Sequence, residues 1–314
     1  MAAVVPVLSF CATNLNTRDR IEESLRSIAE LGRSVDGSYE VVVAEGPSDD
    51  GASEWLAAES GRDPRLRIVR HRQRNRGLGR RLAFEASRGT WIVPFDTSLV
   101  YGTGYGRLLA RFANFGSSKM LFTEICALPR TSVEAVGGWR DLVGGEDVDL
   151  YSRVIAKFGV VAYPTGAAGS QSATLGSYSR QMRYVRGGRL ARVRRIYAVQ
   201  RDQIIASHAT VGDLMAFNRK KPLSARIARR AFFTFAAVGA RFSAIRPVDL
   251  GTNNYLVVRE GLFASLLAGD WKTLAPGDPA PRLLLTDDEI AFLEVRSPFY
   301  RLHQEELAPF LGRK

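Results

Sequence analysis

Cysteine, histidine and long apolar runs are all scarce in this sequence. The chain of 314 residues contains two cysteines, Cys11 and Cys126, too few for the disulfide framework of a secreted protein. The three histidines, His71, His208 and His303, have no metal-ligand spacing among themselves. No stretch reaches the roughly 18–20 apolar residues that a membrane-spanning helix needs. These absences favour a reducing compartment, and we expect a cytoplasmic protein that is soluble or peripheral on the inner face of the cell membrane.

Several sequence motifs of nucleotide-dependent and hydrolytic enzymes are missing as well. Gly77-Leu78-Gly79 is too short for a dinucleotide-binding loop and lacks its third glycine. There is no P-loop, no serine nucleophile elbow, and no glycine-rich basic loop near the first strand of the kind that nucleotidyltransferases use. These absences argue against four large classes of α/β enzyme.

The net charge of +12 is concentrated in one segment. Residues 180–230 contain 14 lysines and arginines against two aspartates, which accounts for the whole excess. A basic segment on a neutral body indicates an anionic partner, such as a diphosphate or an anionic membrane surface, while a solvated face that aids solubility is the alternative. An Arg-rich nucleic-acid-binding protein is a further alternative. We expect no nucleic acid, however, because only Tyr184 and Tyr197 supply aromatic rings between residues 180 and 201.

The first half of the chain alternates strand and helix patterns. A continuous apolar run predicts a buried parallel strand at 4–12. Further strands are expected at 39–44, 66–70 and 90–95, and helices at 17–31, around Trp55, and at 79–87. Thr17 is the predicted N-cap of the first helix. Strands separated by helices predict an α/β fold with a doubly wound, mostly parallel sheet, which binds ligands at the carboxyl ends of its strands. Asn14, Glu45 and Asp96 all follow such ends, so we expect them in one site.

The sequence becomes Arg-rich and helical after about residue 175. We therefore expect a domain at 1–175 and a mainly helical extension at 176–314, with two short helices at 286–294 and 299–311. An amphipathic helix at 224–246 carries an apolar stripe made of Ile227, Ala231, Phe235, Val238, Phe242 and Ile245. Such a stripe either packs inside the protein or lies among the headgroups of an anionic membrane. The pattern leaves both interpretations open.

Four regions of the sequence together resemble glycosyltransferase family 2, whose nucleotide-sugar-binding fold is called GT-A. Glu45 to Gly51 resembles the Asp-Asp-Gly-Ser-Thr-Asp-Gly loop of the family, and Asn75 to Arg81 resembles its Asn-x-Gly helix start. Asp96 to Ser98 falls where the family has Asp-x-Asp. Val136 to Trp139 resembles the Gly-Gly motif, and Gly145 to Leu150 resembles the Glu-Asp motif. The likeness covers about residues 4–155. The short Gly-Arg-Arg helix and Tyr101 resemble a soluble archaeal subgroup of the family.

This resemblance implies an inverting glycosyltransferase. It would move a sugar from a UDP- or GDP-linked donor to a hydroxyl or phosphate acceptor that is lipid-linked or a glycan. Inversion requires a general base, and the resemblance assigns this role to Asp147, with Glu146 helping to place the acceptor. An acidic pair favoured by a helix N-terminus is the alternative for these two residues. The residues expected to contact the donor are Asn14, Glu45, Asp50, Arg80, Asp96, Arg180 and Arg183, and those expected to line the acceptor site are Trp139 and Tyr184.

A divalent metal ion is the cofactor that the resemblance implies. Asp96 is expected to bind Mg²⁺ or Mn²⁺, which prefer oxygen ligands. Ser98 stands where the family has its second aspartate, so we expect only weak ligation there and a reduced or lost metal dependence. His208 is a further candidate ligand, with a surface histidine as the alternative. The changed acidic motif also motivates a second hypothesis, a relative that binds its ligand without turnover.

The segment Arg180-Gln181-Met182-Arg183-Tyr184 resembles a Gln-x-x-Arg-Trp motif of processive family members. Two of its positions differ, with Arg180 in place of Gln and Tyr184 in place of Trp. The resemblance implies that Arg183 faces the diphosphate, where a guanidinium is always charged and can bind two oxygens at once. A solvated arginine face is the alternative for this segment.

Overall fold

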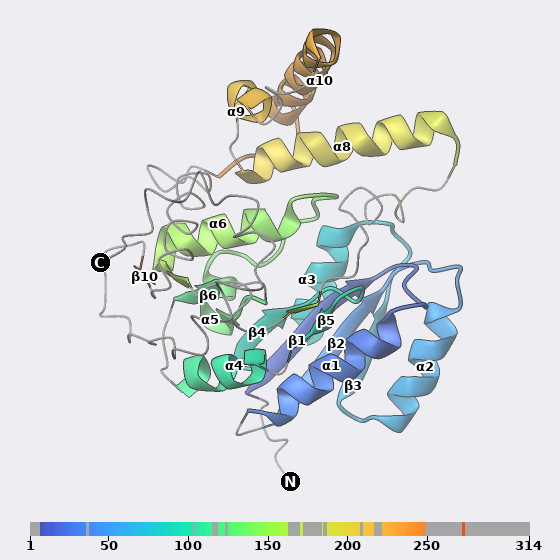
Figure 1. Cartoon of the computed structure of the whole chain (residues 1–314), viewed down its shortest axis with the longest axis vertical. Coiled ribbons are helices and arrows are strands. Elements are labelled where there is room, and N and C mark those ends of the chain that lie inside the picture. Colours follow the sequence, from blue (N-terminus) through green and yellow to red (C-terminus); the bar gives the residue numbers. More distant parts are fainter. Residues whose placement is uncertain are drawn as a thin grey trace.

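The computed structural model describes residues 7–35, 38–102, 104–114, 119–122, 125–162, 170–171, 184, 187–207, 210–216, 222–248 and 272–273. Its centre is a five-stranded sheet in the order β3-β2-β1-β4-β7 (Figure 1). The strands are β1 (Leu8–Asn14), β2 (Tyr39–Glu45), β3 (Leu66–Arg70), β4 (Trp91–Pro94) and β7 (Leu128–Pro129). The first four run parallel, and β7 is antiparallel to β4. The predicted doubly wound, mostly parallel sheet is confirmed.

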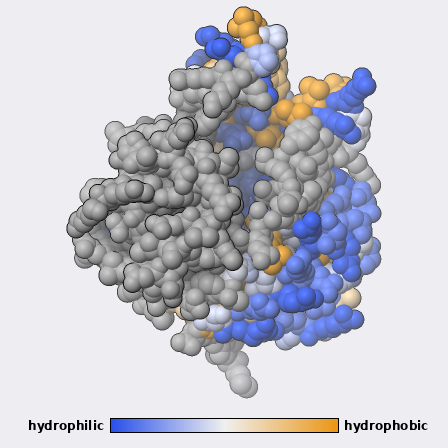
Figure 2. Space-filling model, viewed as in Figure 1, coloured by the Kyte–Doolittle hydropathy of each residue, from blue (hydrophilic) through white to orange (hydrophobic). Residues whose placement is uncertain are grey.

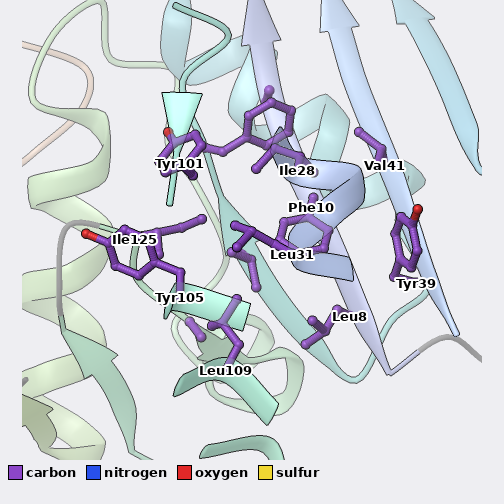
Figure 3. Close-up of a cluster of buried hydrophobic side chains, with 14 of the residues drawn as sticks. Leu8, Phe10, Ile28, Leu31, Tyr39, Val41, Tyr101, Tyr105, Leu109 and Ile125 are labelled. Carbon is purple, nitrogen blue, oxygen red and sulfur yellow. The ribbon is translucent and has the colours of Figure 1, made fainter. Parts of the chain in front are cut away.

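Among the described residues, six helices cover the two faces of this sheet. They are α1 (Ile21–Arg33), α2 (Ala52–Arg62), α3 (Arg76–Ala86), α4 (Gly104–Asn114), α5 (Arg130–Ala135) and α6 (Glu146–Phe158). Alternate residues of β1 point to opposite faces. Phe10 therefore belongs to a cluster with residues of α1, α2 and α4, part of which is shown in Figure 3. Cys11 belongs to the cluster on the other face, with residues of α3, α5 and α6. Both cores consist of fully buried apolar side chains, which contribute about 1.5–3 kcal/mol each for large residues.

Two helix starts differ from the prediction. Thr17 does not cap α1, because its hydroxyl donates to Asn14 Oδ1 at the end of the sheet and the helix starts only at Ile21. The predicted N-cap was therefore wrong. The second difference is α3, which begins three residues earlier than expected, because the Asn75 side chain caps it by accepting the Leu78 N–H at 3.2 Å.

The second half of the described chain adds helices and two small sheets. The sheets have the orders β10-β8-β6 and β5-β9, and their strands are β5 (Val100–Tyr101), β6 (Met120–Phe122), β8 (Val160–Ala162), β9 (Ser170–Gln171) and β10 (Lys272–Thr273). The helices are α8 (Arg189–Ser207), α9 (Val211–Ala216) and α10 (Leu223–Arg241). Residues of α8 and α10 form a separate apolar cluster that also contains Leu142 and packs against Val148 of α6. Among the described helices, none has the length and apolar character needed to cross a membrane.

The predicted domain boundary near residue 175 falls outside the described residues, as do the predicted helices at 286–294 and 299–311. These three expectations stay predictions. The amphipathic helix expected at 224–246 is α10, which ends at Arg241.

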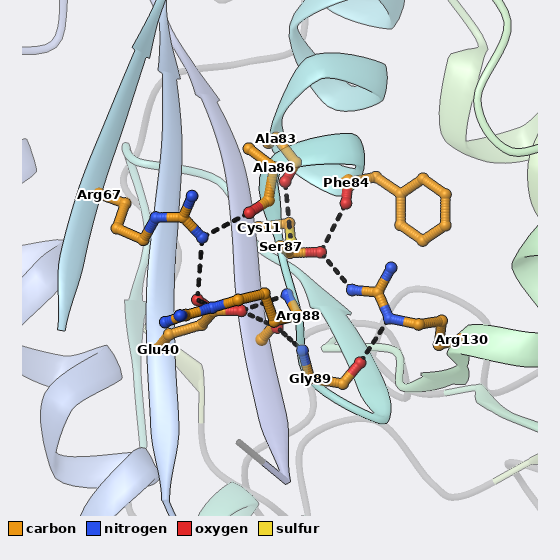
Figure 4. Close-up of polar contacts among 11 residues, drawn as sticks. Cys11, Glu40, Arg67, Ala83, Phe84, Ala86, Ser87, Arg88, Gly89 and Arg130 are labelled. Atoms are coloured by element: carbon orange, nitrogen blue, oxygen red, sulfur yellow. Dashed lines mark hydrogen bonds and ion pairs between the residues drawn. The ribbon is translucent and has the colours of Figure 1, made fainter. Parts of the chain in front are cut away.

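The amino ends of β1 and β2 hold a buried acid with several donors (Figure 4). The Glu40 carboxylate accepts hydrogen bonds from the Ser9 hydroxyl at 2.7 Å, from the Arg88 backbone, and from Arg67 at 3.4 Å. Burial by itself raises the pKa of Glu40, but these donors lower it below its usual range overall. Burial raises the pKa of the nearby Cys11 to about 12, so this thiol is protonated at neutral pH and serves packing.

Candidate active site

The strand order creates a crevice between β1 and β4. From β1 the chain continues to β2 and β3 on one side, and β4 then pairs with β1 on the other, which is the arrangement at which such sheets bind ligands. Arg80 of α3 bridges the two strands, since its Nη1 donates to the carbonyl oxygens of Cys11 at 2.9 Å and Phe95 at 2.7 Å. The Arg80 side chain is buried, so its guanidinium is held rigidly at the crevice.

Two glycines allow α3 to approach this crevice. A Cβ atom at Gly79 would collide with Thr13 Oγ1 on β1. A Cβ atom at Gly77 would lie 2.6 Å from the backbone nitrogen of Leu142, and the Gly77 N–H donates to the Leu142 carbonyl at 3.0 Å. The Gly-x-Gly spacing therefore serves close packing of the helix against the sheet and the loop before α6.

Two arginines of α3 face two successive acids of α6. Arg76 Nε lies 3.0 Å from Glu146 Oε1, and Arg80 Nη2 lies 3.2 Å from Asp147 Oδ2. Because residues four apart share one face of a helix, a single face of α3 supplies both guanidinium groups. The acids occupy the first turn of α6, where the helix dipole favours negative charge, and Gly145 precedes them with a φ of 75°. Burial, together with the Asp147 charge, raises the pKa of Glu146, although Arg76 opposes this.

Asp147 is the more accessible of the two acids. Its side chain is 24% exposed, whereas that of Glu146 is 3% exposed. Asp147 Oδ1 accepts the indole N–H of Trp139 at 2.9 Å, so each carboxylate oxygen has one fixed donor and keeps lone pairs for a further hydrogen bond. The Trp139 ring itself is 1% exposed and packs against Phe84 with ring centroids 5.7 Å apart. It lies behind Asp147, and not on an open surface as an acceptor-lining residue would.

Asp96 is oriented by the residues that follow it. Its Oδ1 accepts the backbone N–H of Ser98 at 2.9 Å and the Ser98 hydroxyl at 2.6 Å, and its own N–H donates to Tyr101 Oη at 2.8 Å. Burial raises the pKa of Asp96, but the charge of Arg76 and the Ser98 hydrogen bonds lower it overall, which keeps the carboxylate ionised. Ser98 is buried and directs its hydroxyl hydrogen to Asp96. Ser98 thus orients the Asp96 carboxylate through these two hydrogen bonds.

A small pocket opens among these groups. Its lining residues are Thr13, Leu15, Thr17, Arg76, Arg80, Asp96, Thr97 and Tyr184. Two buried polar atoms at the pocket, Thr13 Oγ1 and Arg80 Nε, have no hydrogen-bond partner within the described structure. Buried polar groups are rarely left unpaired, so both are candidate partners for a water molecule or a ligand. The pocket thus combines guanidinium and hydroxyl donors, which suit an anionic oxygen ligand such as a phosphate.

Tyr184 closes one side of this pocket. Burial raises the pKa of Tyr184, with Asp96 and Glu146 adding to the effect and Arg76 opposing it. The guanidinium of Arg195 lies 5.1 Å from the centre of the Tyr184 ring. Tyr184 therefore lines the pocket, with its ring held by a cation on α8, while its expected role at the acceptor stays a prediction.

Asn14 and Glu45 lie beneath the pocket. Asn14 Nδ2 donates to Glu45 Oε2 at 2.6 Å, and Thr97 Oγ1 donates to Asn14 Oδ1 at 2.9 Å. The Ser53 hydroxyl donates to the other Glu45 oxygen at 2.7 Å. Asn14 is 0% exposed and Glu45 is 1% exposed. The structure thus differs from the expected direct donor contact, because these side chains support the lining residue Thr97 from behind.

The remaining predicted residues fall elsewhere. Asp50 is exposed and accepts backbone N–H groups of Arg18 at 2.8 Å and Ala52 at 3.0 Å, so it ties its loop to the starts of two helices. Arg180, Arg183 and His208 lie outside the described residues, and their roles stay predictions.

Arg76 is the site residue that we did not predict. It stands beside Asn75 in a motif that resembles the family, and it is four residues before Arg80. This spacing was the available signal, because it places both side chains on one helical face. The charges that surround Arg76, those of Glu146, Asp96 and Asp147, raise its pKa despite burial, so it is permanently charged.

The residues at the pocket supply one of the carboxylates that a divalent metal needs. Among the described residues, no three side chains of histidine, cysteine, aspartate or glutamate gather in a way that would hold an ion. Glu146 and Asp147 are paired with arginines, which leaves Asp96 as the carboxylate that lines the pocket. Mg²⁺ commonly takes one carboxylate together with substrate phosphates. The donor set therefore fits an ion shared with a phosphorylated ligand.

Helix α8 shapes the loop that leads to the acid pair. Asp202 Oδ2 accepts the Val143 N–H at 2.7 Å, and Arg195 Nη2 donates to the Val143 carbonyl at 2.9 Å. A Cβ atom at Gly145 would lie 3.1 Å from Ala206 Cβ, so the glycine lets α8 lie against the start of α6. The basic helical region is thus part of the scaffold that positions Glu146 and Asp147.

Residues 9–115 match the family model described as Glycosyl transferase family 2. The matched segment is about a third of the chain and contains β1 to β4 together with Arg76, Arg80 and Asp96. The match confirms the predicted family resemblance and, with it, the predicted enzyme class, a glycosyltransferase. No curated protein matches the chain.

Two solved structures illustrate the likeness of fold. A mannosyltransferase from Pyrobaculum calidifontis, solved in complex with GDP-Man and Mn²⁺, is 15% identical, with 84% of this chain and 81% of that chain covered and a TM-score of 0.48. Residues 1–349 of TarS from S. aureus, solved in complex with UDP-GlcNAc, are 12% identical, with 83% of this chain and 79% of that chain covered and a TM-score of 0.47. Likeness at this level assigns no ligand to the present chain.

Proposed function

Residues 9–115 form a glycosyltransferase family 2 domain, and from this premise we propose that the protein transfers a sugar from a nucleoside-diphosphate donor to an acceptor with inversion at the anomeric carbon. The donor is UDP- or GDP-linked, and the acceptor is a lipid-linked or glycan hydroxyl or a phosphate. The observation that carries this proposal is the double pairing of Arg76 with Glu146 and of Arg80 with Asp147 around the Asp96 pocket. This arrangement joins a cationic leaving-group site to a carboxylate base.

The donor diphosphate binds at the pocket in this proposal. Arg76 supplies a buried, permanent positive charge, and the unpaired Thr13 hydroxyl and Arg80 Nε–H offer further hydrogen bonds. Negative charge grows on the diphosphate as its bond to the sugar breaks, and donors held in place before the reaction stabilise that charge most effectively. A bound Mg²⁺ or Mn²⁺, held by Asp96 and the donor phosphates, would add to this neutralisation.

Asp147 acts as the general base in this proposal. It removes the proton of the acceptor hydroxyl while the acceptor oxygen bonds to the anomeric carbon, on the face opposite the departing diphosphate. Its exposed fraction of 24%, against 3% for Glu146, favours it over its neighbour. The indole N–H of Trp139 and the guanidinium of Arg80 keep its carboxylate in one orientation. We propose that Trp139 positions the base and that Glu146 keeps Arg76 in place.

A panel of sugar nucleotides tests the donor class. UDP-, GDP- and dTDP-sugars are added to the full chain with and without Mn²⁺, and thermal unfolding is recorded. We expect one nucleotide class to stabilise the protein by about 2.7 kcal/mol at roughly 100 times its Kd, a shift of roughly 5 °C. Release of the nucleoside diphosphate is then measured with the donor that binds.

The outcomes separate the hypotheses. If no sugar nucleotide shifts the Tm, the proposed donor class is wrong. If a donor binds but no nucleoside diphosphate is released, with any acceptor or by hydrolysis, the protein is a binding-only relative. If the donor raises the Tm only when Mn²⁺ is present, this supports ligation of the ion by Asp96. If the Tm shift is equal without the ion, the arginines neutralise the donor diphosphate by themselves.

A further inference from the structure

Helix α10 buries small side chains and exposes large apolar ones. Ala236 and Ala240 are its buried residues, at 0% and 3% exposed. The exposed fractions are 68% for Leu223, 63% for Ile227, 65% for Phe235, 45% for Val238 and 82% for Phe242. A helix that packs inside a domain buries its apolar stripe. Here the stripe points away from the protein, which favours the surface interpretation of the sequence pattern.

The exposed residues of α10 form one continuous stripe with a basic border. At 3.6 residues per turn, the five large side chains fall within about 120° of the helix circumference. Arg226, Arg230 and Arg241, all exposed, follow one edge of this stripe. Large apolar residues beside arginines are the pattern of helices that lie in the plane of a membrane interface.

Helix α8 extends the same surface. Leu190 is 63% exposed and Val193 is 56% exposed, and both share a helical face with Tyr197. The Tyr197 ring packs against Phe235 of α10 with centroids 5.1 Å apart, which joins the two stripes. We call the exposed apolar residues of α8 and α10, with the arginines around them, the amphipathic face. Figure 2 shows apolar and hydrophilic residues side by side on this part of the molecule.

The charge around this face is mostly positive. The described parts of the chain between residues 187 and 248 contain ten arginines and two aspartates. One of the aspartates, Asp202, is 1% exposed and already accepts hydrogen bonds from Val143 and Arg201. A partner that covers the face must therefore offer negative charge next to an apolar layer.

We propose that the amphipathic face binds an anionic membrane surface. Its large apolar side chains enter the headgroup region, and its arginines contact lipid phosphates. A second copy of the chain is a poorer occupant, because a symmetric dimer through this face would place the same arginines on both sides of the interface and supply no negative charge to pair with them. An anionic bilayer supplies both the apolar depth and the negative charge.

The consequence for sugar transfer rests on the proposed function. The same α8 that carries Leu190 and Val193 positions the loop before Glu146 through Asp202. A membrane bound to this face would therefore hold the candidate active site beside the bilayer, where a lipid-linked acceptor resides. Membrane binding itself does not depend on sugar transfer and can be measured without it.

Co-sedimentation of the full chain with vesicles tests the proposal. Phosphatidylcholine vesicles are compared with vesicles that also contain phosphatidylglycerol. We expect at least about tenfold stronger binding to the anionic vesicles, weakened by salt because the arginine contacts are screened. The double variants Ile227→Ser/Phe242→Ser and Arg226→Glu/Arg230→Glu should each reduce the partition coefficient at least about tenfold.

The matched control makes the same charge change elsewhere. Arg26→Glu/Arg62→Glu alters two arginines on α1 and α2 whose side chains are 65% and 74% exposed, and we expect binding within about twofold of the wild type. Circular dichroism and the Tm verify that each variant is folded. If the serine variant unfolds, the Arg226→Glu/Arg230→Glu variant carries the test.

Two results would overturn the proposal. One is an absence of binding to anionic vesicles, or binding that neither double variant weakens. The other is a wild-type chain that does not bind vesicles and forms a dimer in light scattering, which Ile227→Ser/Phe242→Ser converts to a monomer. The amphipathic face would then be the interface with a second copy of the chain. If the chain binds vesicles but no sugar nucleotide, membrane binding by the amphipathic face is supported and the proposed function is wrong.

Discussion

The two ends of the central sheet hold buried acids in different settings. At the amino end, Glu40 is surrounded by Ser9, Arg67 and Arg88. None of the unpaired buried polar atoms of the described residues belongs to that network. At the carboxyl end, Arg80 bonds to Asp147 yet keeps an unpaired Nε–H at a pocket. The same residue types thus form a closed network at one end and an open one at the other.

The difference teaches what to look for in a site. A buried acid whose donors are all supplied by the protein contributes to stability, since any unpaired group would cost about 1–3 kcal/mol. A cluster that leaves buried donors unpaired carries that cost in the free protein and recovers it when a ligand binds. The amino-end cluster is therefore expected to control stability, and the carboxyl-end cluster to control activity. Three substitutions test this division.

Asp147→Asn should have the largest effect. The amide cannot accept a proton from the acceptor, so we expect kcat to fall about 10³-fold while donor affinity stays within a few-fold. Initial rates of transfer and a donor titration give the two quantities. Asp141→Asn is the matched control, because Asp141 is 43% exposed and pairs with Arg81 at the surface. Full turnover by Asp147→Asn would remove this residue as the base.

Arg76→Gln should have the next largest effect, on donor binding. A hydrogen bond to a charged group contributes about 1.5–3 kcal/mol, so we expect the donor Kd to rise roughly 10–100-fold. The substitution also strands Glu146 without its partner, and for this reason Arg76→Gln/Glu146→Gln is measured alongside it. Arg81→Gln, one turn along α3 at the surface, is the control. Unchanged donor affinity in the double variant would show that Arg76 does not contact the donor.

Glu40→Gln should have the smallest effect, and on stability alone. We expect the free energy of unfolding to fall by about 1–2 kcal/mol, with kcat and donor Kd within about twofold of the wild type. Denaturant unfolding measures the free energy of unfolding, and transfer assays measure kcat and the donor dependence of the rate. A loss of activity in the folded variant would contradict the division between the two ends.

The pH dependence of the same variant sharpens this result. The donors around Glu40 lower its pKa in the folded protein, so the carboxylate stabilises the fold above its usual pKa and loses this contribution as the pH falls through the lowered value. The stability difference between wild type and Glu40→Gln should therefore shrink between about pH 6 and about pH 3. A difference that does not change with pH would mean that Glu40 is uncharged in the folded protein.

Much of the sheet and part of the site were predictable from local patterns. The strand predicted at 66–70 is β3, and that predicted at 39–44 is β2 with one more residue, because short segments rich in valine and isoleucine between polar turns are a local signal. Asp96 was predictable because parallel strands bring their carboxyl ends to one edge of the sheet. The acid pair Glu146–Asp147 was predictable only through its resemblance to the Glu-Asp motif of the family. Their proposed roles in catalysis still await the substitutions above.

Other features depended on contacts between distant segments. The Thr17 hydroxyl joins Asn14 instead of capping a helix, which no local rule favours over the cap. The burial of Trp139 followed from its packing against Phe84 of α3, a helix more than 50 residues earlier in the chain. Sequence periodicity cannot show which neighbour covers a given side chain.

The sequence by itself determined the alternation of strands and helices, the chemical nature of the acids and arginines, and the amphipathic stripe of α10. Only the tertiary structure decided how these parts meet. The close approach that Gly77 and Gly79 allow turns Arg76 and Arg80 toward α6. The small side chain of Ala236, buried in the cluster shared with α8, leaves the large apolar residues of α10 facing outward. The physical reason is that propensity and periodicity act between neighbours in sequence, whereas pairing and exposure depend on which distant surfaces fit together.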